Sequence, residues 1–247
     1  KCRKMISIMS RNKKLLVFIF WIAVWQAAYM IIGSDVLFAS PLNTLKAAVD
    51  LISHADFYKT ITFSFLRIAL GFFAGTAAGI LLGAATGASG VIYMLFKPLI
   101  DIVRAAPVAS FIILALAWLK AGTVPLFISF LTVVPIVWSN ISEGINSADK
   151  KLLEMARVYE FTGKMRLRNI YIPAVKPYLR SAVVTGAGFA FKSGVAAEVI
   201  GSPAFSIGRK LYESKIYLET EQLFAWTAVI IILSVVFERL LVRYVGR

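Results

Sequence analysis

The chain has 247 residues, of which 59% are hydrophobic, and its mean hydropathy is +0.78. Because about half of the residues of a soluble globular domain are apolar, this composition excludes an ordinary soluble fold and indicates an integral membrane protein. The net charge of +14 comes from cations that lie between apolar runs rather than on one polar face, a placement that favours topology control and anionic lipid over nucleic-acid binding.

The inventory of chemically reactive side chains is small. Cys2 is the single cysteine and His54 the single histidine, so the sequence excludes an internal disulfide and argues against a Cys/His metal site. The sequence also lacks a GxxxxGK[ST] phosphate loop, an HExxH motif and clustered carboxylates. We therefore expect no catalytic, cofactor-binding or metal site in this chain.

The first apolar run follows a basic segment. Residues 15–33 carry no charge and would extend about 28 Å as a helix, enough for the hydrocarbon core of a bilayer. We expect an uncleaved transmembrane helix there, with residues 1–14 as a basic cytoplasmic N-terminus and residues 15–247 as a single transmembrane domain. Residues 41–59 carry apolar side chains at helical spacing and predict an amphipathic helix on the outer surface, with His54 in a solvated or interfacial position.

The second span, residues 60–86, carries a glycine at every fourth position. This spacing lines the glycines along one helix face and predicts close packing against another helix in the membrane. The glycines are Gly71, Gly75, Gly79 and Gly83. Arg67 lies near the outer end of the same span, where a charge must pair, reach the interface or line a water-filled cavity.

The next apolar run contains two prolines. We expect an interfacial piece over residues 91–97 and then a span over residues 99–119 that Pro107 bends. Asp101 and Arg104 are three residues apart, so we expect them to pair on one helix face.

Three further spans follow, over residues 124–141, 181–200 and 223–241. Between the first and second of these lies a long loop, residues 142–180. The loop and both termini carry more Lys and Arg than the other connections, which places them in the cytoplasm by the positive-inside rule. The sequence therefore predicts an all-α integral membrane protein with six transmembrane helices.

The long loop predicts two short helices joined by a bend. The apolar side chains that recur at helical spacing are Leu152, Met155, Ala156 and Tyr159. We expect Ser147 to cap the first helix, Gly163 to end it, and a second helix over residues 164–171 to stop at Pro173. Such a pair could form a rigid knob that a soluble partner grips. The alternative is an amphipathic segment that lies on the inner leaflet.

The loop resembles the signature loop of ABC importer permeases, the binding-protein-dependent inner-membrane components. The pattern there is Glu-Ala-Ala, three residues, Gly, nine residues, Ile, one residue and Leu-Pro. Glu154, Ala156, Ile170 and Pro173 match at the same spacing, and Ile172 conservatively replaces the Leu. The resemblance favours the knob over the segment on the leaflet, because the motif stands before the last two of six spans.

Two positions depart from the family pattern. Met155 replaces an Ala, and Glu160 replaces the Gly, so we expect Gly163 to take over the turn between the helices. The resemblance implies that a cytoplasmic coupling loop of about residues 142–180 binds an ATPase subunit. The residues that it implies for this contact are Glu154, Met155, Ala156, Arg157, Glu160, Gly163, Ile170, Ile172 and Pro173.

From residue 15 onward the chain resembles the sulfonate, taurine and nitrate branch of these permeases. The stretches that carry this resemblance are Ser64–Arg67, Pro98–Pro107 and Ala197–Gly201. The resemblance implies a type I ABC importer permease in the bacterial cytoplasmic membrane, multi-pass, with both termini in the cytoplasm. The implied partners are membrane lipid, a second copy of the chain, an extracytoplasmic solute-binding protein, and two cytoplasmic ABC ATPase subunits that hold ATP and Mg²⁺; no nucleic acid is implied.

Four charged residues within the spans are candidates for the solute pathway: Arg67, Arg104, Lys192 and Glu198. Three of them are cations, which would favour an anionic or polar solute; sulfonates, taurine, nitrate, bicarbonate and vitamin precursors stay open. One alternative is an ion-coupled secondary transporter that uses Lys192 and Glu198. Another is an intramembrane protease, because residues 87–90 read Gly-Ala-Ser-Gly, but the predicted topology places His54, the only available base, on the opposite side of the membrane.

Overall fold

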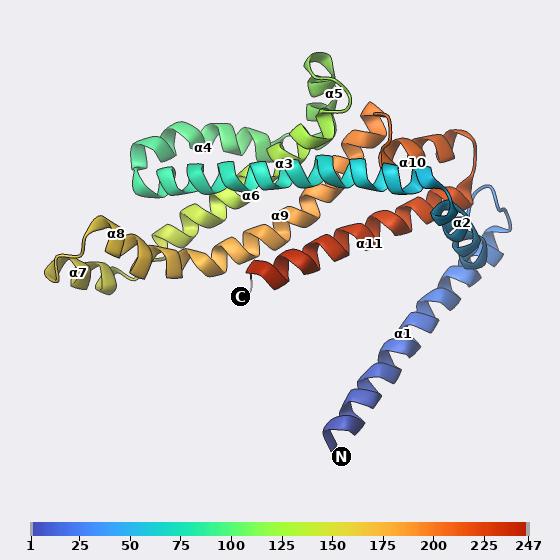
Figure 1. The fold of residues 1–247 in the computed structure, drawn as a ribbon, viewed down its shortest axis with the longest axis horizontal. Helices are drawn as coiled ribbons and strands as arrows, with labels where there is room; N and C mark the ends of the chain where they lie inside the picture. The colour runs from blue at the N-terminus through green and yellow to red at the C-terminus, as the bar shows by residue number, and fades with distance from the viewer. Residues whose placement is uncertain (1, 246–247) are drawn as a thin grey trace. The chain divides into compact units, whose positions relative to one another are not determined.

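The computed structural model describes the backbone of residues 2–245 and the side chains of residues 15–243. Within these limits every regular element is a helix, which confirms the all-α membrane fold (Figure 1). The elements are α1 (Cys2–Ile32), α2 (Pro41–Ser53), α3 (Ala55–Ala88), α4 (Gly90–Ala105), α5 (Val108–Trp118), α6 (Val124–Asn146), α7 (Lys150–Val158), α8 (Gly163–Arg166), the π-helix η1 (Leu167–Tyr171), α9 (Ile172–Gly201), α10 (Ile207–Ile216) and α11 (Thr220–Val245). The expected basic tail, residues 1–14, lies outside the described side chains.

Five helical stretches of the described chain are long and apolar enough to cross a membrane: α1, α3, α6, the continuous run from α8 to α9, and α11. A sixth crossing results if α4 and α5 count as one broken span. Their axes differ by 103°. The count therefore agrees with the six predicted spans when the broken pair is taken as one.

The break in this third span lies at Pro107, and the expected break at Pro98 is wrong. Pro98 lies inside the continuous helix α4, whereas Pro107 takes an extended conformation with φ −60° and ψ 130° between α4 and α5. The residue before a proline is driven out of the helical region, and Ala106 has ψ 141°. Because Leu99 and Ile100 continue the apolar pattern of α4, that helix runs through its proline instead of ending there.

The chain divides into two compact units, of which the first contains residues 1–58 and 210–229. Its core is aromatic. The ring of Trp25 stacks on Phe224 with centroids 5.7 Å apart, and the indole N–H of Trp25 donates to the carbonyl of Ala39 (3.0 Å). Trp226 is buried and its ring lies 5.4 Å from that of Phe57. These contacts fasten the start of α11 to α1 and to the segment around α2.

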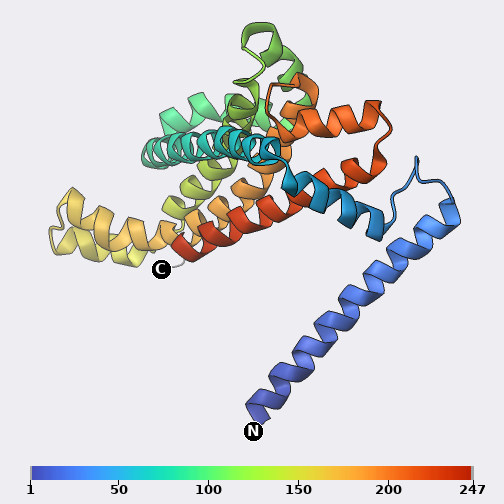
Figure 2. The same ribbon diagram turned by 45° about the vertical axis from the view of Figure 1, so that its right-hand side comes forward.

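The second unit contains residues 59–209 and 230–247, and α6 forms its centre. Figures 1 and 2 show α6 alongside both α3 and α9. The four glycines of α3 all face α6: a Cβ built on Gly79 would lie 2.6 Å from the Cβ of Val137, and one on Gly83 would lie 2.7 Å from that of Ile141. Since no side chain fits at these distances, the glycines allow the two backbones to approach closely.

The cytoplasmic loop predicted between the fourth and fifth spans is shorter in the structure than expected. Helix α6 extends to Asn146, and α8, η1 and α9 follow one another without a break in helical backbone, so Pro173 does not stop the helix. Pro173 stands in the first turn of α9, where a missing N–H is tolerated, and the π-turn before it absorbs the local change in helical register. The part outside the long helices is therefore residues 147–162.

Candidate functional site

The segment between α6 and α9, residues 147–171, forms a folded projection that we call the knob. Its first helix, α7, is capped by Asp149, whose carboxylate accepts a hydrogen bond from the backbone N–H of Lys151 (2.8 Å). The predicted cap, Ser147, instead donates its hydroxyl to the carbonyl of Gly144 at the end of α6 (2.9 Å). The cap prediction was wrong by two residues because α6 extends farther than expected and uses Ser147 for its own C-terminus.

The bend of the knob lies at Glu160, and the expectation that Gly163 would replace it is wrong. Glu160 has φ 52°, in the left-handed region that favours glycine. Around it the N–H of Phe161 donates to the carbonyl of Ala156 (2.8 Å), and the N–H of Glu160 to that of Arg157 (3.1 Å). This pair of bonds is the Schellman arrangement that ends many helices, and it needs a left-handed residue at this position. Gly163 is the first residue of α8, which Thr162 caps.

The knob has a small hydrophobic core of its own. Ala148, Ala156 and Ile170 are buried against one another, and Phe161 and Tyr171 pack around them. Two of the residues implied by the family motif, Ala156 and Ile170, therefore lie inside the knob and hold its two halves together. They do not form its surface.

The other motif residues of the knob lie on its surface. Glu154, Met155 and Arg157 are exposed on α7, and Tyr159 at the end of α7 is 71% exposed. Large apolar side chains left exposed on a folded projection are typical of a surface that binds another protein. Ile172 and Pro173, at the start of α9, are exposed as well, and so is Gly163.

Two of the candidate pathway residues, Arg67 and Glu198, meet each other inside the protein. Glu198 is fully buried; its Oε2 accepts hydrogen bonds from the hydroxyl of Ser64 (2.8 Å) and from the N–H of Gly208 (3.2 Å). The guanidinium of Arg67 lies 3.9 Å from Glu198 Oε1 and donates to the carbonyls of Ala204 (3.1 Å) and Phe205 (3.3 Å).

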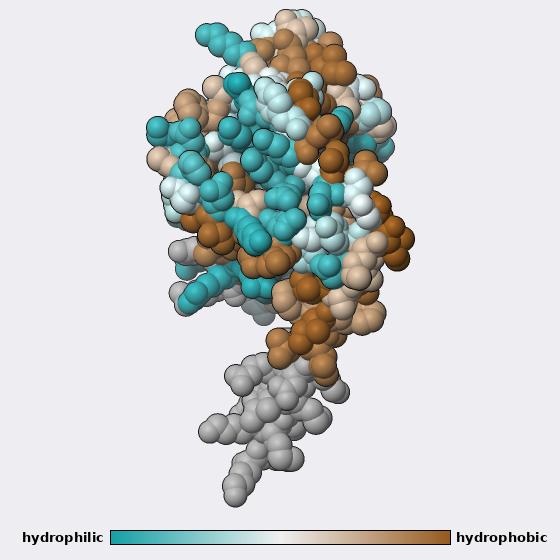
Figure 3. Space-filling model, turned by 90° about the vertical axis from the view of Figure 1, so that its right-hand side faces the viewer, coloured by the Kyte–Doolittle hydropathy of each residue, from teal (hydrophilic) through white to brown (hydrophobic). Residues whose placement is uncertain are grey.

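This network fastens the segment between α9 and α10 onto α3. Ser64 also accepts a hydrogen bond from the N–H of Ile207 (2.9 Å), so three side chains of the network hold both ends of the segment. The segment contains two non-glycine residues in left-handed conformation, Ser202 and Phe205. Figure 3 shows hydrophilic (teal) and hydrophobic (brown) side chains on the face that it draws. Arg67 and Glu198 therefore contribute to the structure of this end, and their role as pathway residues stays a prediction.

Lys192 does not share a surface with Glu198, which is fully buried. Lys192 is exposed on α9, about 14 Å from the C-terminal end of that helix, and its ammonium group lies 5.8 Å from the ring centroid of Phe189. The exposed stripe of α9 to which it belongs consists of Ser181, Thr185, Phe189, Lys192, Ala196 and Ile200. Apart from Phe189 and Ile200 these side chains are small or polar, and a cation within a span is costly in lipid hydrocarbon unless it pairs or faces water or protein.

Arg104 lies in a groove of about 290 Å³ between α4 and α6. Asp101, which was expected to pair with Arg104, instead forms an ion pair with Lys97, one turn earlier (2.6 Å). The spacings of three and four residues both allow a pair on a helix, and the sequence alone does not choose between them. Glu143 of α6 lines the same groove, which therefore presents charges of both signs.

Sequence reasoning did not single out Ser64, which holds both Glu198 and the N-terminus of α10. It stands 134 residues from Glu198 in the chain, and helical spacing says nothing about such a contact. The one sequence feature that could have pointed to Ser64 is the Ser64–Arg67 stretch, which carries part of the family resemblance.

Comparison with known proteins matches residues 75–247 to the family described as "Binding-protein-dependent transport system inner membrane component". Among named relatives, the chain is 28% identical over 208 residues to SsuC of Bacillus subtilis, an aliphatic sulfonates transport permease protein, covering 83% of this chain and 74% of that protein. It is 28% identical over 191 residues to NrtB of Synechococcus elongatus, a nitrate import permease protein, covering 73% and 68%. It is 26% identical over 159 residues to CmpB of the same organism, a bicarbonate transport system permease protein, covering 64% and 57%.

Solved structures show the same fold at low sequence identity. A bacterial ABC transporter involved in the import of the acidic polysaccharide alginate superposes with a TM-score of 0.67 at 15% identity, covering 99% of both chains. An amino acid ABC transporter superposes with a TM-score of 0.60 at 22% identity, covering 76% of this chain and 94% of that one. The family match covers most of the chain, and the fold agrees with it. The chain therefore belongs to the binding-protein-dependent transport system inner-membrane components, the permease subunits of ABC importers, in the branch that contains the sulfonate and nitrate permeases.

Proposed function

We propose that two copies of this chain form the membrane path of an importer that takes up a small anion. Two cytoplasmic ATPase subunits, which bind ATP and Mg²⁺, grip the knobs, and an extracytoplasmic binding protein delivers the solute. The observation that carries this proposal is the knob itself. It is a rigid projection with its own buried core, and it exposes Glu154, Met155 and Tyr159 to a partner.

The proposed orientation places the knob and both termini in the cytoplasm. Cations are concentrated in the knob and in the first turns of α9, at Lys150, Lys151, Arg157, Lys164, Arg166, Arg168, Lys176 and Arg180. Short loops with this excess of Lys and Arg stay on the cytoplasmic side. The segment held by Glu198, at the other end of α9, then faces the outside.

The knob is built to transmit motion to the membrane helices. It joins the end of α6 on one side, and on the other it passes through η1 into α9 without a break in helical backbone. Helices α6 and α9 pack along each other, and α3 packs on α6 through its glycines. A displacement of the knob therefore moves tightly packed helices, because packed interiors shift as units instead of deforming locally.

The anionic character of the solute is supported by Lys192. Its ammonium group lies on the exposed stripe of α9, which we propose lines the path between the two copies. The relatives named for sulfonates, nitrate and bicarbonate all carry anions, which agrees with a cation at this place. An ammonium group attracts an anion as a point charge. It does not form the bidentate hydrogen bonds of a guanidinium, which would slow the release of the anion.

The experiment is ATP-driven uptake in proteoliposomes that contain the permease with its ATPase subunits and binding protein. Radiolabelled nitrate, bicarbonate and an aliphatic sulfonate serve as probes. We expect uptake of one of these anions that requires ATP and the ATPase subunits. Lys192→Ala should reduce the uptake about 10-fold or more, and Lys192→Arg should retain most of it, since the charge is kept. Uptake by the permease alone, driven by an ion gradient, would contradict the proposal.

A further inference from the structure

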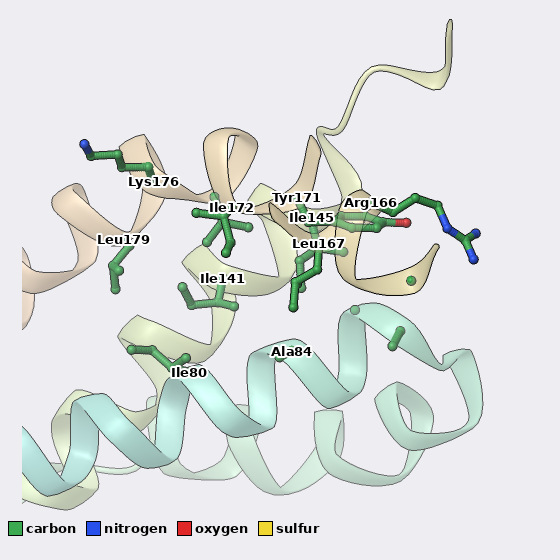
Figure 4. Close-up of a pocket in the computed structure, with 14 residues that line it drawn as sticks. Ile80, Ala84, Ile141, Ile145, Arg166, Leu167, Tyr171, Ile172, Lys176 and Leu179 are labelled. Carbon is green, nitrogen blue, oxygen red and sulfur yellow. The ribbon is translucent and has the colours of Figure 1, made fainter. Parts of the chain in front are cut away.

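The structure contains an apolar cavity of about 730 Å³ behind the knob. Figure 4 shows that its walls come from three places: Ile80 and Ala84 of α3, Ile141 and Ile145 of α6, and Leu167 with the residues that follow it in η1 and α9. Protein interiors are packed without voids of this size, so the cavity has room for another molecule. Its volume lies within the range of small-molecule sites.

The charged side chains among the described residues that line the cavity are both cations. Arg166 and Lys176 line it, and their charged ends point away from the apolar floor toward opposite ends of the opening, as Figure 4 shows. Among the residues that the structure describes, no acidic side chain lines the cavity, and Tyr171 adds a hydroxyl. An apolar floor with cations at its rim complements an amphiphile that has an acyl chain and an anionic head.

We propose that this cavity binds one molecule of an anionic phospholipid, with an acyl chain against the apolar floor that α3 and α6 form and its headgroup at the basic rim to which Arg166 and Lys176 contribute. The chain spans a membrane, so lipid is present around it at high concentration. Basic side chains where membrane helices meet the cytoplasmic interface recognise anionic headgroups. The proposal rests on the knob lying at this interface, as argued under the proposed function.

The position of the cavity gives the lipid a role. Its wall includes Gly163, Arg166 and Leu167, which belong to the knob, and α3 and α6, which belong to the membrane core. A bound acyl chain would fill the space between them and couple the knob to the helices that it has to move. Part of the wall is the π-helix η1, an element that often marks functional positions. The binding-protein-stimulated ATPase activity should then depend on anionic lipid.

The test uses the purified complex of permease, ATPase subunits and binding protein in vesicles of phosphatidylcholine alone or mixed with phosphatidylglycerol. Lipid retained by the complex is measured by native mass spectrometry after release into detergent. Since each basic side chain near the headgroup contributes about a 5-fold preference, Arg166→Gln with Lys176→Gln should lower the retention of phosphatidylglycerol about 30-fold. The matched control is Arg168→Gln with Arg180→Gln, which removes two nearby cations that do not line the cavity and should leave the retention unchanged.

A second variant fills the cavity without changing any charge. Ala84→Phe places a ring where the acyl chain would lie, and it should abolish the retained lipid while the complex stays assembled. A photo-crosslinking residue in place of Ile145 identifies the occupant directly, and we expect a lipid adduct. Equal retention in all variants, no preference for phosphatidylglycerol, or an adduct with a second permease copy or an ATPase subunit would overturn the proposal. These readouts measure lipid on the assembled complex, so they stand whether or not uptake of a particular anion is found.

Discussion

The backbone N–H of Phe161 donates to the carbonyl of Ala156 (2.8 Å) across a turn that is centred on Glu160, with φ 52°. The family motif has a glycine at this position. In this chain a glutamate stands there and adopts the left-handed conformation that glycine favours. The bend between the two halves of the knob is therefore set by the hydrogen bonds and by the packing of Phe161 on the knob core. Glycine is not required for it, but its absence leaves local strain.

Replacing Glu160 with glycine should stabilise the knob. A non-glycine residue in the left-handed region costs about 1–2 kcal/mol, and part of this is offset because glycine loses more backbone entropy on folding. We expect a net gain of about 1 kcal/mol, seen as a higher midpoint of thermal unfolding and slower trypsin cleavage within residues 150–168.

The control for that variant is Gly163→Ala. Gly163 lies at the start of α8, and a Cβ there would meet nothing within 4 Å. It should therefore leave trypsin cleavage unchanged or slow it slightly. A strong loss of stability in Gly163→Ala, with no gain in Glu160→Gly, would show that the turn depends on Gly163 after all.

Ala156 should tolerate no larger side chain, because it is 1% exposed and lies in the core of the knob. Ala156→Leu adds three carbons to this packed space and should cost about 1–3 kcal/mol, and Ile170→Ala should cost about 2–4 kcal/mol by leaving a cavity. Both variants should release the ATPase subunits during purification while the permease still inserts into the membrane. Normal co-purification of the ATPase subunits with both variants would show that the core of the knob does not support the contact.

The contact of α3 with α6 should depend on the absence of side chains along the glycine face. In Gly79→Ala the new Cβ would lie 2.6 Å from the Cβ of Val137, an atom fixed to the backbone, so the helices have to separate. We expect a loss of about 1–3 kcal/mol, measured as a lower unfolding temperature in detergent. Gly90→Ala is the control, because a Cβ at Gly90 meets nothing within 4 Å. If both variants unfold at the temperature of the unaltered protein, the close approach of the helices is not needed.

Glu198 should be required for the order of the segment between α9 and α10. Glu198→Ala leaves Ser64 and the N–H of Gly208 without their buried acceptor and Arg67 without its carboxylate, which should destabilise the protein by about 3–5 kcal/mol. Glu198→Gln keeps an acceptor oxygen and should lose less than half of that. The measurement is the unfolding temperature together with protease cleavage within residues 202–206. Equal behaviour of the Ala and Gln variants would contradict a role for the hydrogen-bonded acceptor.

The parts of this structure that could be predicted from sequence are those that depend on local pattern. The long apolar runs indicated the spans, and the four-residue spacing of Gly71 to Gly83 describes a helix face that the structure places against α6. The spacing of Glu154, Ala156, Ile170 and Pro173 indicated the family, which the comparison with known proteins confirms.

The parts that could not be predicted are of two kinds. Some depend on local alternatives that are similar in energy, and others depend on contacts between residues far apart in the chain. Asp101 can pair at a distance of three or four residues along α4, and it pairs with Lys97 because of side-chain geometry that the sequence does not contain. Pro98 and Pro107 are both prolines in apolar helices, yet only the second breaks its helix. The contact of Ser64 with Glu198 joins two helices, so helical periodicity in either of them cannot reveal it.

The central claim is that the exposed surface of the knob couples the ATPase subunits to the permease, and a variant of that surface tests it most directly. The double variant Glu154→Lys with Met155→Asp alters two exposed residues of α7 and leaves the buried Ala156 unchanged. Asp50→Lys, an exposed acidic position on α2, is the control for charge reversal. ATP-driven anion uptake and binding-protein-stimulated ATPase activity are measured together in proteoliposomes. We predict that the double variant inserts and folds normally but loses about 10-fold or more in uptake and in the stimulated ATPase activity, as expected when central contacts of an interface are removed. Normal uptake with normal stimulation would contradict the assignment of the knob as the coupling element.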